Sequence, residues 1–355
     1  MHHRRIHLLM FLLFLVCTGL GGCASMGYYL QSVSGQMQIL HRERPMRSII
    51  ADADTGPALR DRLDFIRTVV DFAHDRLHLP DNGSYRDYAD LDRPYVTWNV
   101  FAAPALSLQP RQWCYLVVGC LAYRGYFSKD RARRYGEKLR RQGRDVFVGG
   151  VRAYSTLGWF RDPVLNTMLG QEDWEIARLL FHELAHQKLY IDGETDVDEA
   201  FAETVARIGL DRWLQDRPPD QRRRVHRLLA HEDALMGLLL DYRDRFHRLY
   251  HSDLTAQAKR AGKARLFARL QAAYQRLRSN WGDDHRYDAW MDNDLNNAKL
   301  AAISTYYRLI PAFLALYQAG GRDLDRFYRY MESLKGCDHA TLRQRIRIYS
   351  PGQGC

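Results

Sequence analysis

The stretch of sequence that decides the fold is His182-Glu183-Leu184-Ala185-His186, inside a longer amphipathic pattern from Trp174 to Tyr190 that predicts a helix. Residues four apart lie on one face of a helix, one turn apart, so the two imidazoles can reach one metal ion. The glutamate projects about 100° around the helix axis, so its carboxylate can reach a water on that ion without binding the ion. The small and apolar residues of the motif favour this interpretation over a core helix with two incidental histidines.

The His-Glu-x-x-His spacing is the arrangement of zinc peptidases, in which both histidines bind Zn²⁺ and the glutamate is the general base. A catalytic zinc takes a third protein ligand and leaves its fourth position for water. Asp192 stands six residues after His186, where metzincins place that ligand, but Leu189 stands where their pattern requires glycine to turn the chain. We therefore expect one Zn²⁺ per chain, with its third ligand further along the sequence.

The next helical pattern, from Asp198 to Leu214, begins with Asp198-Glu199-Ala200-Phe201-Ala202. This run resembles the Asn-Glu-Gly-Phe-Ala run of gluzincin aminopeptidases, whose glutamate binds zinc, and the resemblance implies Glu199 as the third ligand. Asp198 replaces the asparagine, and it either tightens metal binding or caps the helix. Asp192-Gly193 can supply the turn that brings this helix back beside the first. Glu203 follows four residues later on the same face, where it either orients a zinc-bound histidine or is a surface carboxylate.

Two further parts of a zincin active site have candidates. Zincins pair the extended substrate with a strand near the active-site helix, and residues 151–160 alternate reasonably and precede that helix; the alternative is an internal strand. Zincins also use a donor, commonly Tyr or His, to stabilise the oxyanion. We choose Tyr306 for this role, with Tyr307 and Tyr154 as rivals.

The N-terminus has the features of an export and lipidation signal. Arg4 and Arg5 precede an apolar stretch from Leu8 to Leu20 that is too short to span a bilayer comfortably. Leu20-Gly21-Gly22-Cys23 looks like a bacterial lipobox, and the resemblance implies that residues 1–22 are removed and Cys23 is acylated. The alternative is an ordinary signal peptide or an interfacial helix. The residue after the cysteine is Ala24, not Asp, which in Gram-negative lipoproteins indicates transfer to the outer membrane.

Composition places the chain among ordinary globular proteins. Its 355 residues are 46% hydrophobic and 26% charged, which argues against disordered, collagen-like and polytopic membrane proteins. The net charge is +10, and the densest basic run is Arg222 to Arg224 with Arg227. We interpret that run as a solvated helix face, because no aromatic stacking motif accompanies it. The expected partners are a peptide substrate and a membrane, with no nucleic acid.

Four cysteines remain after Cys23, and export places them in an oxidising compartment. They are Cys114, Cys120, Cys337 and Cys355. Four cysteines allow three pairings, and the most local one joins the first two and the last two. The lack of a Cys-x-x-Cys spacing disfavours a zinc knuckle.

The other patterns predict an α+β fold, mostly helical and zincin-like, with one small sheet ahead of the active-site helix. Helices are expected over 57–79, 131–141, 221–250, 255–279, 293–319 and 322–334, and strands over 95–101, 115–118, 123–127, 145–151 and 151–157. The chain divides into the signal peptide (1–22), a lipidated tether (23–45), an N-terminal helix plus small sheet (46–170), and the His-Glu-x-x-His helix with a C-terminal helical region (171–355). The last two segments are expected to pack as one catalytic unit.

Six segments resemble the bacterial zinc aminopeptidase lipoprotein family, and they span nearly the whole mature chain. They are Gly27-Tyr28-Tyr29-Leu30-Gln31, Leu79-Pro80-Asp81-Asn82-Gly83-Ser84-Tyr85, Tyr95-Val96-Thr97-Trp98-Asn99-Val100, Gly119-Cys120-Leu121-Ala122-Tyr123-Arg124-Gly125-Tyr126-Phe127, Ala153-Tyr154-Ser155-Thr156-Leu157-Gly158-Trp159-Phe160 and Asn296-Asn297-Ala298-Lys299-Leu300. The resemblance implies a zinc-dependent aminopeptidase, lipid-anchored in the bacterial cell envelope on the periplasmic face of the outer membrane.

Exopeptidases also need a carboxylate that captures the α-ammonium group of the substrate. No segment like the Gly-Ala-Met-Glu-Asn of known aminopeptidases supplies it, and Asp162, Glu172 and Asp173 are merely nearby in sequence. The alternatives are therefore a zinc endopeptidase of the envelope and a non-catalytic zinc-binding lipoprotein. The intact Glu183 argues against the second, because a structural zinc site has no use for a base and usually fills all four positions with protein ligands.

Overall fold

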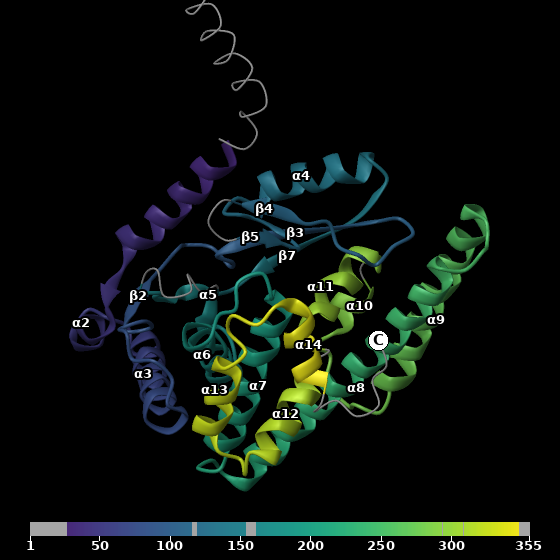
Figure 1. The fold of residues 1–355 in the computed structure, drawn as a ribbon. Helices are drawn as coiled ribbons and strands as arrows, with labels where there is room; N and C mark the ends of the chain where they lie inside the picture. The colour runs from purple at the N-terminus through teal and green to yellow at the C-terminus, as the bar shows by residue number, and fades with distance from the viewer. Residues whose placement is uncertain (1–26, 116–118, 154–160, 293, 308, 348–355) are drawn as a thin grey trace, which may run out of the picture.

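The computed structural model describes residues 27–115, 119–153, 161–292, 294–307 and 309–347 (Figure 1). Residues 27–42 form a helix, here called the N-terminal helix. The later helices are α2 (Met46–Ala51), α3 (Pro57–Leu77), α4 (Lys129–Arg141), α5 (Asn166–Leu169), α6 (Asp173–Lys188), α7 (Thr195–Leu214), α8 (Pro219–Tyr250), α9 (Ala256–Arg278), α10 (Asp288–Asp292), α11 (Asn297–Tyr307), α12 (Ile310–Ala319), α13 (Leu324–Glu332) and α14 (His339–Arg347). The strands are β1 (Arg44–Pro45), β2 (Asp87–Ala89), β3 (Thr97–Pro104), β4 (Trp113–Tyr115), β5 (Gly119–Leu121), β6 (Arg124–Tyr126), β7 (Arg144–Val151) and β8 (Val164–Leu165). The mostly helical α+β fold expected from the sequence is confirmed.

The described strands form three small sheets where the sequence indicated one. Their orders are β6-β3-β7, β1-β2-β8 and β4-β5. In the first sheet β3 pairs antiparallel with β7 along its whole length, from Thr97 opposite Val151 to Pro104 opposite Arg144. The strands β1, β2 and β8 are two or three residues long, which is too short for the alternation that reveals a strand in a sequence.

Two helices with regular apolar faces, α3 and α6, contribute to the larger hydrophobic core together with α7. In α3 the residues Leu63, Ile66, Val70, Ala73 and Leu77 recur at three- and four-residue spacing and are all fully buried. Helix α3 ends at His78, whose left-handed backbone conformation (φ 55°) stops the helix before Pro80. Helix α6 packs against α3 and buries its own apolar residues in the same core. This core is the support on which the His-Glu-x-x-His motif stands.

The β6-β3-β7 sheet lies between α4 on one face and α11 on the other (Figure 1). Two asparagines attach α11 to the ends of the strands. Asn296 Nδ2 donates a hydrogen bond to the carbonyl of Val146 (3.2 Å), and Asn297 Nδ2 donates one to the carbonyl of Pro104 (3.0 Å). The Asn-Asn-Ala segment therefore has a structural role here.

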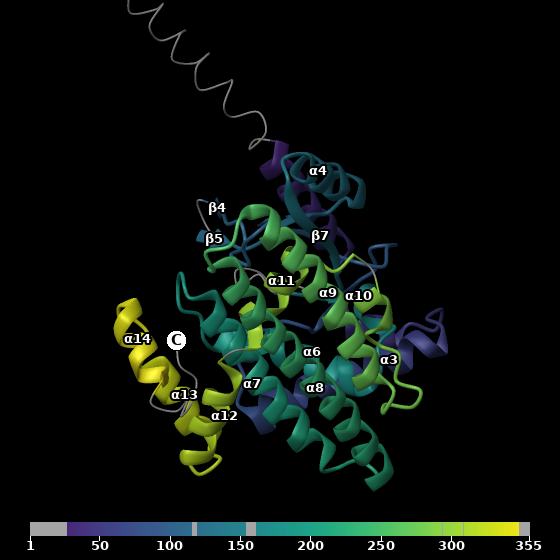
Figure 2. The same ribbon diagram turned by 90° about the vertical axis from the view of Figure 1, so that its right-hand side faces the viewer.

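The C-terminal half of the chain is a set of packed helices. Helices α8 and α9 run side by side in both views (Figures 1 and 2) and enclose a second core, in which the rings of Phe246 and Phe267 are 4.5 Å apart. The single helix expected over 293–319 is divided into α11 and α12. Pro311 lies in the first turn of α12, where proline is tolerated because its missing N–H would have no partner within the helix.

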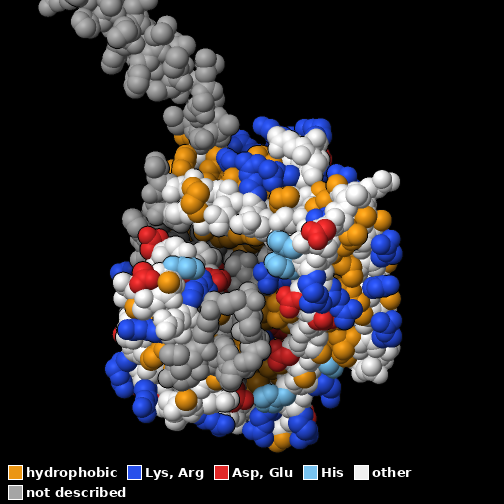
Figure 3. Space-filling view, turned by 45° about the vertical axis from the view of Figure 1, so that its right-hand side comes forward, with side chains coloured by type: hydrophobic (Ala, Val, Ile, Leu, Met, Phe, Trp, Pro, Cys, Tyr) orange, Lys and Arg blue, Asp and Glu red, His pale blue; other side chains and the backbone are white. Residues whose placement is uncertain are grey.

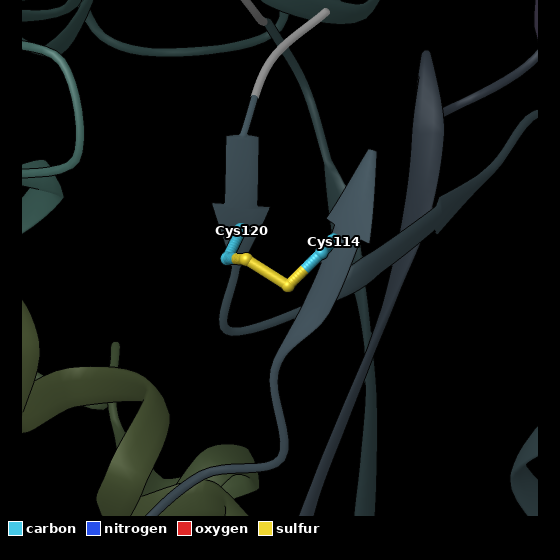
Figure 4. Close-up of a disulfide and its surroundings, with 2 residues drawn as sticks. All are labelled: Cys114 and Cys120. Atoms are coloured by element: carbon cyan, nitrogen blue, oxygen red, sulfur yellow. A yellow bond between two sulfur atoms is a disulfide. The ribbon is translucent and has the colours of Figure 1, made fainter. Parts of the chain in front are cut away.

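A disulfide joins Cys114 in β4 to Cys120 in β5, across the register of that hairpin (Figure 4). This is the first bond of the most local pairing predicted from the sequence. Cys337 forms no disulfide within the described part of the chain. Its expected partner, Cys355, lies outside the described residues, so that half of the prediction stays a prediction.

The expected signal peptide and Cys23 also lie outside the described residues. Of the helices that are described, none combines the length and the apolar character needed to cross a bilayer. The N-terminal helix lies within the segment expected to be a tether, with Gln31, Gly35 and Ile39 buried at four-residue spacing.

Candidate metal centre

The centre is built on the hairpin of α6 and α7. Gly193 adopts a left-handed conformation (φ 79°) in the connecting loop, which glycine reaches without steric cost, and the predicted turn at Asp192-Gly193 is thereby confirmed. The carboxylate of Asp198 then closes the loop, because its Oδ1 accepts a hydrogen bond from the backbone N–H of Ile191 (2.8 Å). Gly209 lets α7 approach α6 and α3 closely, since its neighbours are the side chains of Leu77 and Phe181.

Three side chains converge on one point of this hairpin. The Nε2 atoms of His182 and His186 are 3.1 Å apart, and Glu199 Oε2 lies 3.3 Å from the first and 3.6 Å from the second. Among the described residues, these form the one group of three or more His, Cys, Asp or Glu side chains placed to hold a metal ion.

The geometry of these atoms fits a zinc ion. Ligands bound tetrahedrally at about 2.0–2.1 Å from zinc are about 3.3 Å from one another, which is close to the three separations in the structure. Two imidazole nitrogens and one carboxylate oxygen are also the donor set of catalytic zinc sites that keep an open position for water. The structure therefore brings the residues predicted as ligands together, with Glu199 and not Asp192 beside the two histidines. Asp192 is exposed and lies near Gly119.

The charges of the three candidate ligands are tightly coupled. Burial alone would lower the pKa of His182, but hydrogen bonds to Glu199 and Glu203 outweigh it and raise that pKa to about 10. Burial would raise the pKa of Glu199, yet the hydrogen bonds from the two imidazoles hold it at about 2. In the metal-free protein, the ionised carboxylate of Glu199 therefore forms an ion pair with the protonated imidazole of His182, and the same carboxylate can bind a cation.

Glu183 is buried beside the candidate ligands. Burial raises the pKa of its carboxyl group; the positive charges of His182 and His186 oppose the shift, and the negative charges of Glu199 and Asp162 add to it. These interactions place the carboxyl group within electrostatic reach of all three candidate ligands. A buried carboxyl group with a raised pKa, next to a candidate metal site, is suited to proton transfer.

Glu203 lies behind His182, on the side away from the metal position. Its Oε2 is 3.6 Å from Nδ1 of His182, and its Oε1 accepts hydrogen bonds from Arg178 (2.5 Å) and Arg207 (2.9 Å). A carboxylate in this place orients the imidazole and fixes which nitrogen faces the metal. Of the two interpretations that the sequence left open, the structure supports the orienting carboxylate, because Glu203 is buried.

A buried polar network extends outward from Glu203, and it was not predicted from the sequence. Arg178 also donates two hydrogen bonds to the carboxylate of Glu232 on α8 (2.6 and 2.8 Å). That carboxylate in turn accepts hydrogen bonds from the hydroxyls of Tyr307 (2.9 Å) and Tyr287 (3.3 Å). Each charged member has a partner of opposite charge, as burial of ions requires. Arg178 lies four residues before His182, so its spacing is the only signal that sequence reasoning could have used.

A second group of residues, whose packing together was not predicted from the sequence, lies along the Glu183 side of α6. Ser84 Oγ accepts hydrogen bonds from Gln187 Nε2 (3.2 Å) and from the backbone N–H of Asp162 (3.3 Å), which ties two distant loops to this face. Tyr85 follows with a positive φ of 59°, and its N–H donates to the carbonyl of Asp162 (2.6 Å). Burial raises the pKa of Tyr85, and the charges of Glu183 and Asp162 raise it further.

The hydroxyl of Tyr85 is buried and has no hydrogen-bond partner among the described residues. Strained residues and unpaired buried polar groups concentrate at functional sites. Tyr123, before β6, also lies near Glu199 and Glu183. Burial raises the pKa of Tyr123, and the negative charges of these two carboxylates raise it further. Both tyrosines fall in segments that carry the family resemblance, which was the available signal.

The remaining predicted site residues have mixed outcomes. Tyr306 belongs to α11, but its side chain is outside the described atoms, so its oxyanion role stays a prediction. Its rival Tyr307 bonds to Glu232 in the buried network, and Tyr154 lies outside the described residues. The expected substrate strand, 151–160, is described only to residue 153. Its first residue, Val151, ends β7, which is an edge strand of its sheet.

Comparison with known proteins gives one result. The family model described as "Putative aminopeptidase" matches residues 27–346, which is most of the chain. No curated protein and no solved structure matches the chain. The match includes α6, α7 and every residue assigned to the centre. The chain therefore belongs to the family described as "Putative aminopeptidase".

Proposed function

We propose that this family member is a zinc-dependent aminopeptidase, anchored by a lipid at Cys23 to the periplasmic face of the outer membrane. The observation that carries the zinc assignment is the convergence of His182, His186 and Glu199, whose ligand atoms are 3.1–3.6 Å apart beside the buried Glu183. The anchor is supported by the lipobox-like Leu20-Gly21-Gly22-Cys23. Peptide hydrolysis is supported by the family to which the chain belongs.

In the proposed reaction, each residue has a separate task. His182 and His186 hold a zinc ion through Nε2, and Glu199 holds it through a carboxylate oxygen. The bound ion supplies the Lewis acidity that activates water and polarises a carbonyl group. The carboxylate of Glu183 takes one proton from the attacking water and delivers it to the leaving nitrogen as the peptide C–N bond breaks. Glu203 keeps the imidazole of His182 oriented throughout.

For an aminopeptidase, the carboxylate that captures the substrate's α-ammonium group must lie near the scissile bond. Of the three candidates from the sequence, Glu172 bonds to Arg224 (2.6 Å) and Asp173 to Arg62 (2.5 Å). Asp162 is buried and close enough to Glu183 to raise its pKa. We therefore assign ammonium capture to Asp162, because it is the one of the three candidates that lies close to Glu183.

The test combines metal content with hydrolysis of aminoacyl reporter substrates. We expect about one zinc per chain, hydrolysis that a chelator abolishes, and no hydrolysis once the substrate's N-terminus is blocked. Glu183→Gln should retain zinc and lose about 10²–10⁴-fold in kcat, because only the base is removed. His182→Ala should lose both zinc and activity.

Each part of the proposal can fail by itself. Activity in a zinc-loaded Glu183→Gln protein would exclude Glu183 as the base. Cleavage of N-terminally blocked peptides would identify an endopeptidase instead. If one zinc ion were bound per chain but no peptide were hydrolysed, the protein would instead be a non-catalytic zinc-binding lipoprotein.

A further inference from the structure

We propose that the N-terminal helix and α4 together form a surface that lies flat on an anionic phospholipid bilayer. This surface belongs to the folded protein and is distinct from any lipid chain attached to Cys23. It consists of an exposed apolar stripe (Tyr29, Leu30, Val33 and Met37) and of the basic side chains of α4.

The apolar stripe contains most of the large hydrophobic side chains that are exposed among the described residues. Six such side chains are exposed among the described residues, and four of them form this stripe, with exposed fractions between 40% and 63%. Their three- and four-residue spacing places them within an arc of about 100° of the helix. The opposite side of the same helix is buried against the protein. Contiguous exposed apolar surface of this kind marks a site of interaction.

The N-terminal helix is held firmly, so the stripe has a fixed orientation. The ring of Tyr28 stacks on Tyr115 at 5.3 Å, and the guanidinium of Arg124 lies 4.1 Å from the ring centre of Tyr28. Gln31 Oε1 accepts a hydrogen bond from the backbone N–H of Phe127 (3.0 Å). The stripe therefore cannot turn inward to bury itself.

Helix α4 adds positive charge beside the stripe. Its basic residues are all exposed and outnumber its acidic ones, Asp130 and Glu137; they are Lys129, Arg131, Arg133, Arg134, Lys138, Arg140 and Arg141. An open groove of about 720 Å³ connects the two helices and is lined by Leu30 of the stripe and by Arg93 and Arg131. Figure 3 shows hydrophobic and basic side chains next to each other at the end of the molecule that carries α4.

A bilayer fits this surface better than the other available occupants. In the proposed lipoprotein, residues 1–22 are removed and the acylated Cys23 stands four residues before Gly27, so the stripe lies close along the chain to the bilayer. If the apolar stretch 8–20 were retained, it would bring Arg4 and Arg5 but no acidic residue, so it could not neutralise α4. A second copy would bring the same cations. Anionic headgroups above an apolar layer match both parts, as for other interfacial amphipathic helices.

Hydroxyl-radical footprinting of the full chain in vesicles tests the proposal with native probes. Tyr29 and Tyr190 are the same residue type with nearly equal exposed fractions, 40% and 39%, so they form a matched pair. In vesicles of phosphatidylcholine with phosphatidylglycerol, we expect Tyr29 to be oxidised at least about threefold more slowly than Tyr190, with Met37 protected in parallel. Pure phosphatidylcholine and 1 M NaCl should reduce this protection.

Two outcomes overturn the proposal. Equal oxidation of Tyr29 and Tyr190 in anionic vesicles would show that the stripe does not lie on the bilayer. Protection that is independent of lipid charge and salt would place a different occupant on the stripe, either segment 8–20 or a second copy.

Two double variants distinguish the effect of the positive charge of α4 from an effect of misfolding. Arg131→Glu combined with Arg134→Glu should raise oxidation of Tyr29 towards that of Tyr190 in anionic vesicles. Arg265→Glu combined with Arg269→Glu, on exposed positions of α9, changes the net charge equally and should leave the protection intact. The same loss of protection in both variants, or in neither, contradicts a specific role for α4. Thermal unfolding of both variants serves as the check on folding.

Discussion

Glu203 connects the candidate metal ligand His182 to two guanidinium groups, and this single residue explains why the site can hold so much charge in a buried position. A carboxylate that touched only the imidazole would pay its full desolvation cost. Arg178 and Arg207 offset that cost and keep the pKa of Glu203 well below its usual range, although burial acts in the opposite direction. Glu203 therefore stays ionised and keeps pulling the Nδ1 proton of His182 towards itself.

Zinc binding should release protons, and His182 is the source. With a pKa of about 10 in the metal-free protein, its imidazole is protonated at pH 7.5, whereas a zinc ligand must be neutral at the bound nitrogen. Titration calorimetry in buffers of different ionisation enthalpy should therefore report about one proton released per zinc from this residue. Glu203→Gln removes one of the groups that raise this pKa, so it should lower the proton yield. Zinc binding with no buffer dependence would contradict the coupling.

At the scale of elements, the helices with regular apolar faces could be predicted and the shortest elements could not. The periodicity of 57–79 and 174–190 reproduces α3 and α6 to within a few residues at either end. Helices α2 and α10 and strands β1, β2 and β8 are too short to show any period. The three candidate metal ligands could be found because they all lie on two consecutive helices. The approach of Tyr85, Tyr123 and Asp162 to Glu183 could not be predicted, because long-range packing alone brings them there.

The contact between α6 and α7 depends on a residue without a side chain. A methyl group at Gly209 would lie 2.5 Å from Leu77 Cδ1 and 2.8 Å from Phe181 Cδ2, both in the buried core. Gly209→Ala gains up to about 1 kcal/mol of helix propensity but costs about 1–3 kcal/mol by overpacking. We expect a net loss of about 1 kcal/mol in the free energy of unfolding, and weaker zinc binding because Phe181 precedes His182.

Gly237→Ala is the matched control for that substitution. Gly237 lies within α8, where a methyl group would meet no neighbouring atom, so helix propensity alone should stabilise the protein by about 0.5–1 kcal/mol. Urea unfolding of both variants with and without zinc gives the comparison. If Gly209→Ala were as stable as Gly237→Ala, the close approach of the two helices would not limit this position.

At the scale of the whole molecule, stability should fall in acid because buried carboxylates must be protonated. Asp284 is an example of such a buried carboxylate, and it lies outside the candidate metal centre. Burial would raise its pKa, but hydrogen bonds from Arg286 and His231 hold it at about 2, below the ordinary 3.8. A lowered carboxyl pKa stabilises the folded state above the unfolded value, and this stabilisation is lost as pH falls from about 4 to about 2.

Asp284→Asn should remove the pH-dependent contribution of this carboxylate to the free energy of unfolding. Between pH 4 and pH 2 the free energy of unfolding of the variant should fall by about 1–2 kcal/mol less than that of the unsubstituted protein. Asp61→Asn, at an exposed position of α3, should follow the unsubstituted protein. The free energy of unfolding is measured by urea unfolding at each pH. If it fell equally between pH 4 and pH 2 for all three proteins, the Arg286 contact would contribute nothing to stability in acid.

The position of the metal ligands along the chain also has a consequence for the order of assembly. All three fall between residues 182 and 199, on a hairpin whose connecting loop is short, so little chain entropy is lost when they meet. The β3–β7 ladder, by contrast, must close a much longer intervening stretch, from Pro104 to Arg144 at its nearest pair. If zinc binds as proposed, a nascent helical hairpin could therefore capture the ion before the rest of the polypeptide condenses around it.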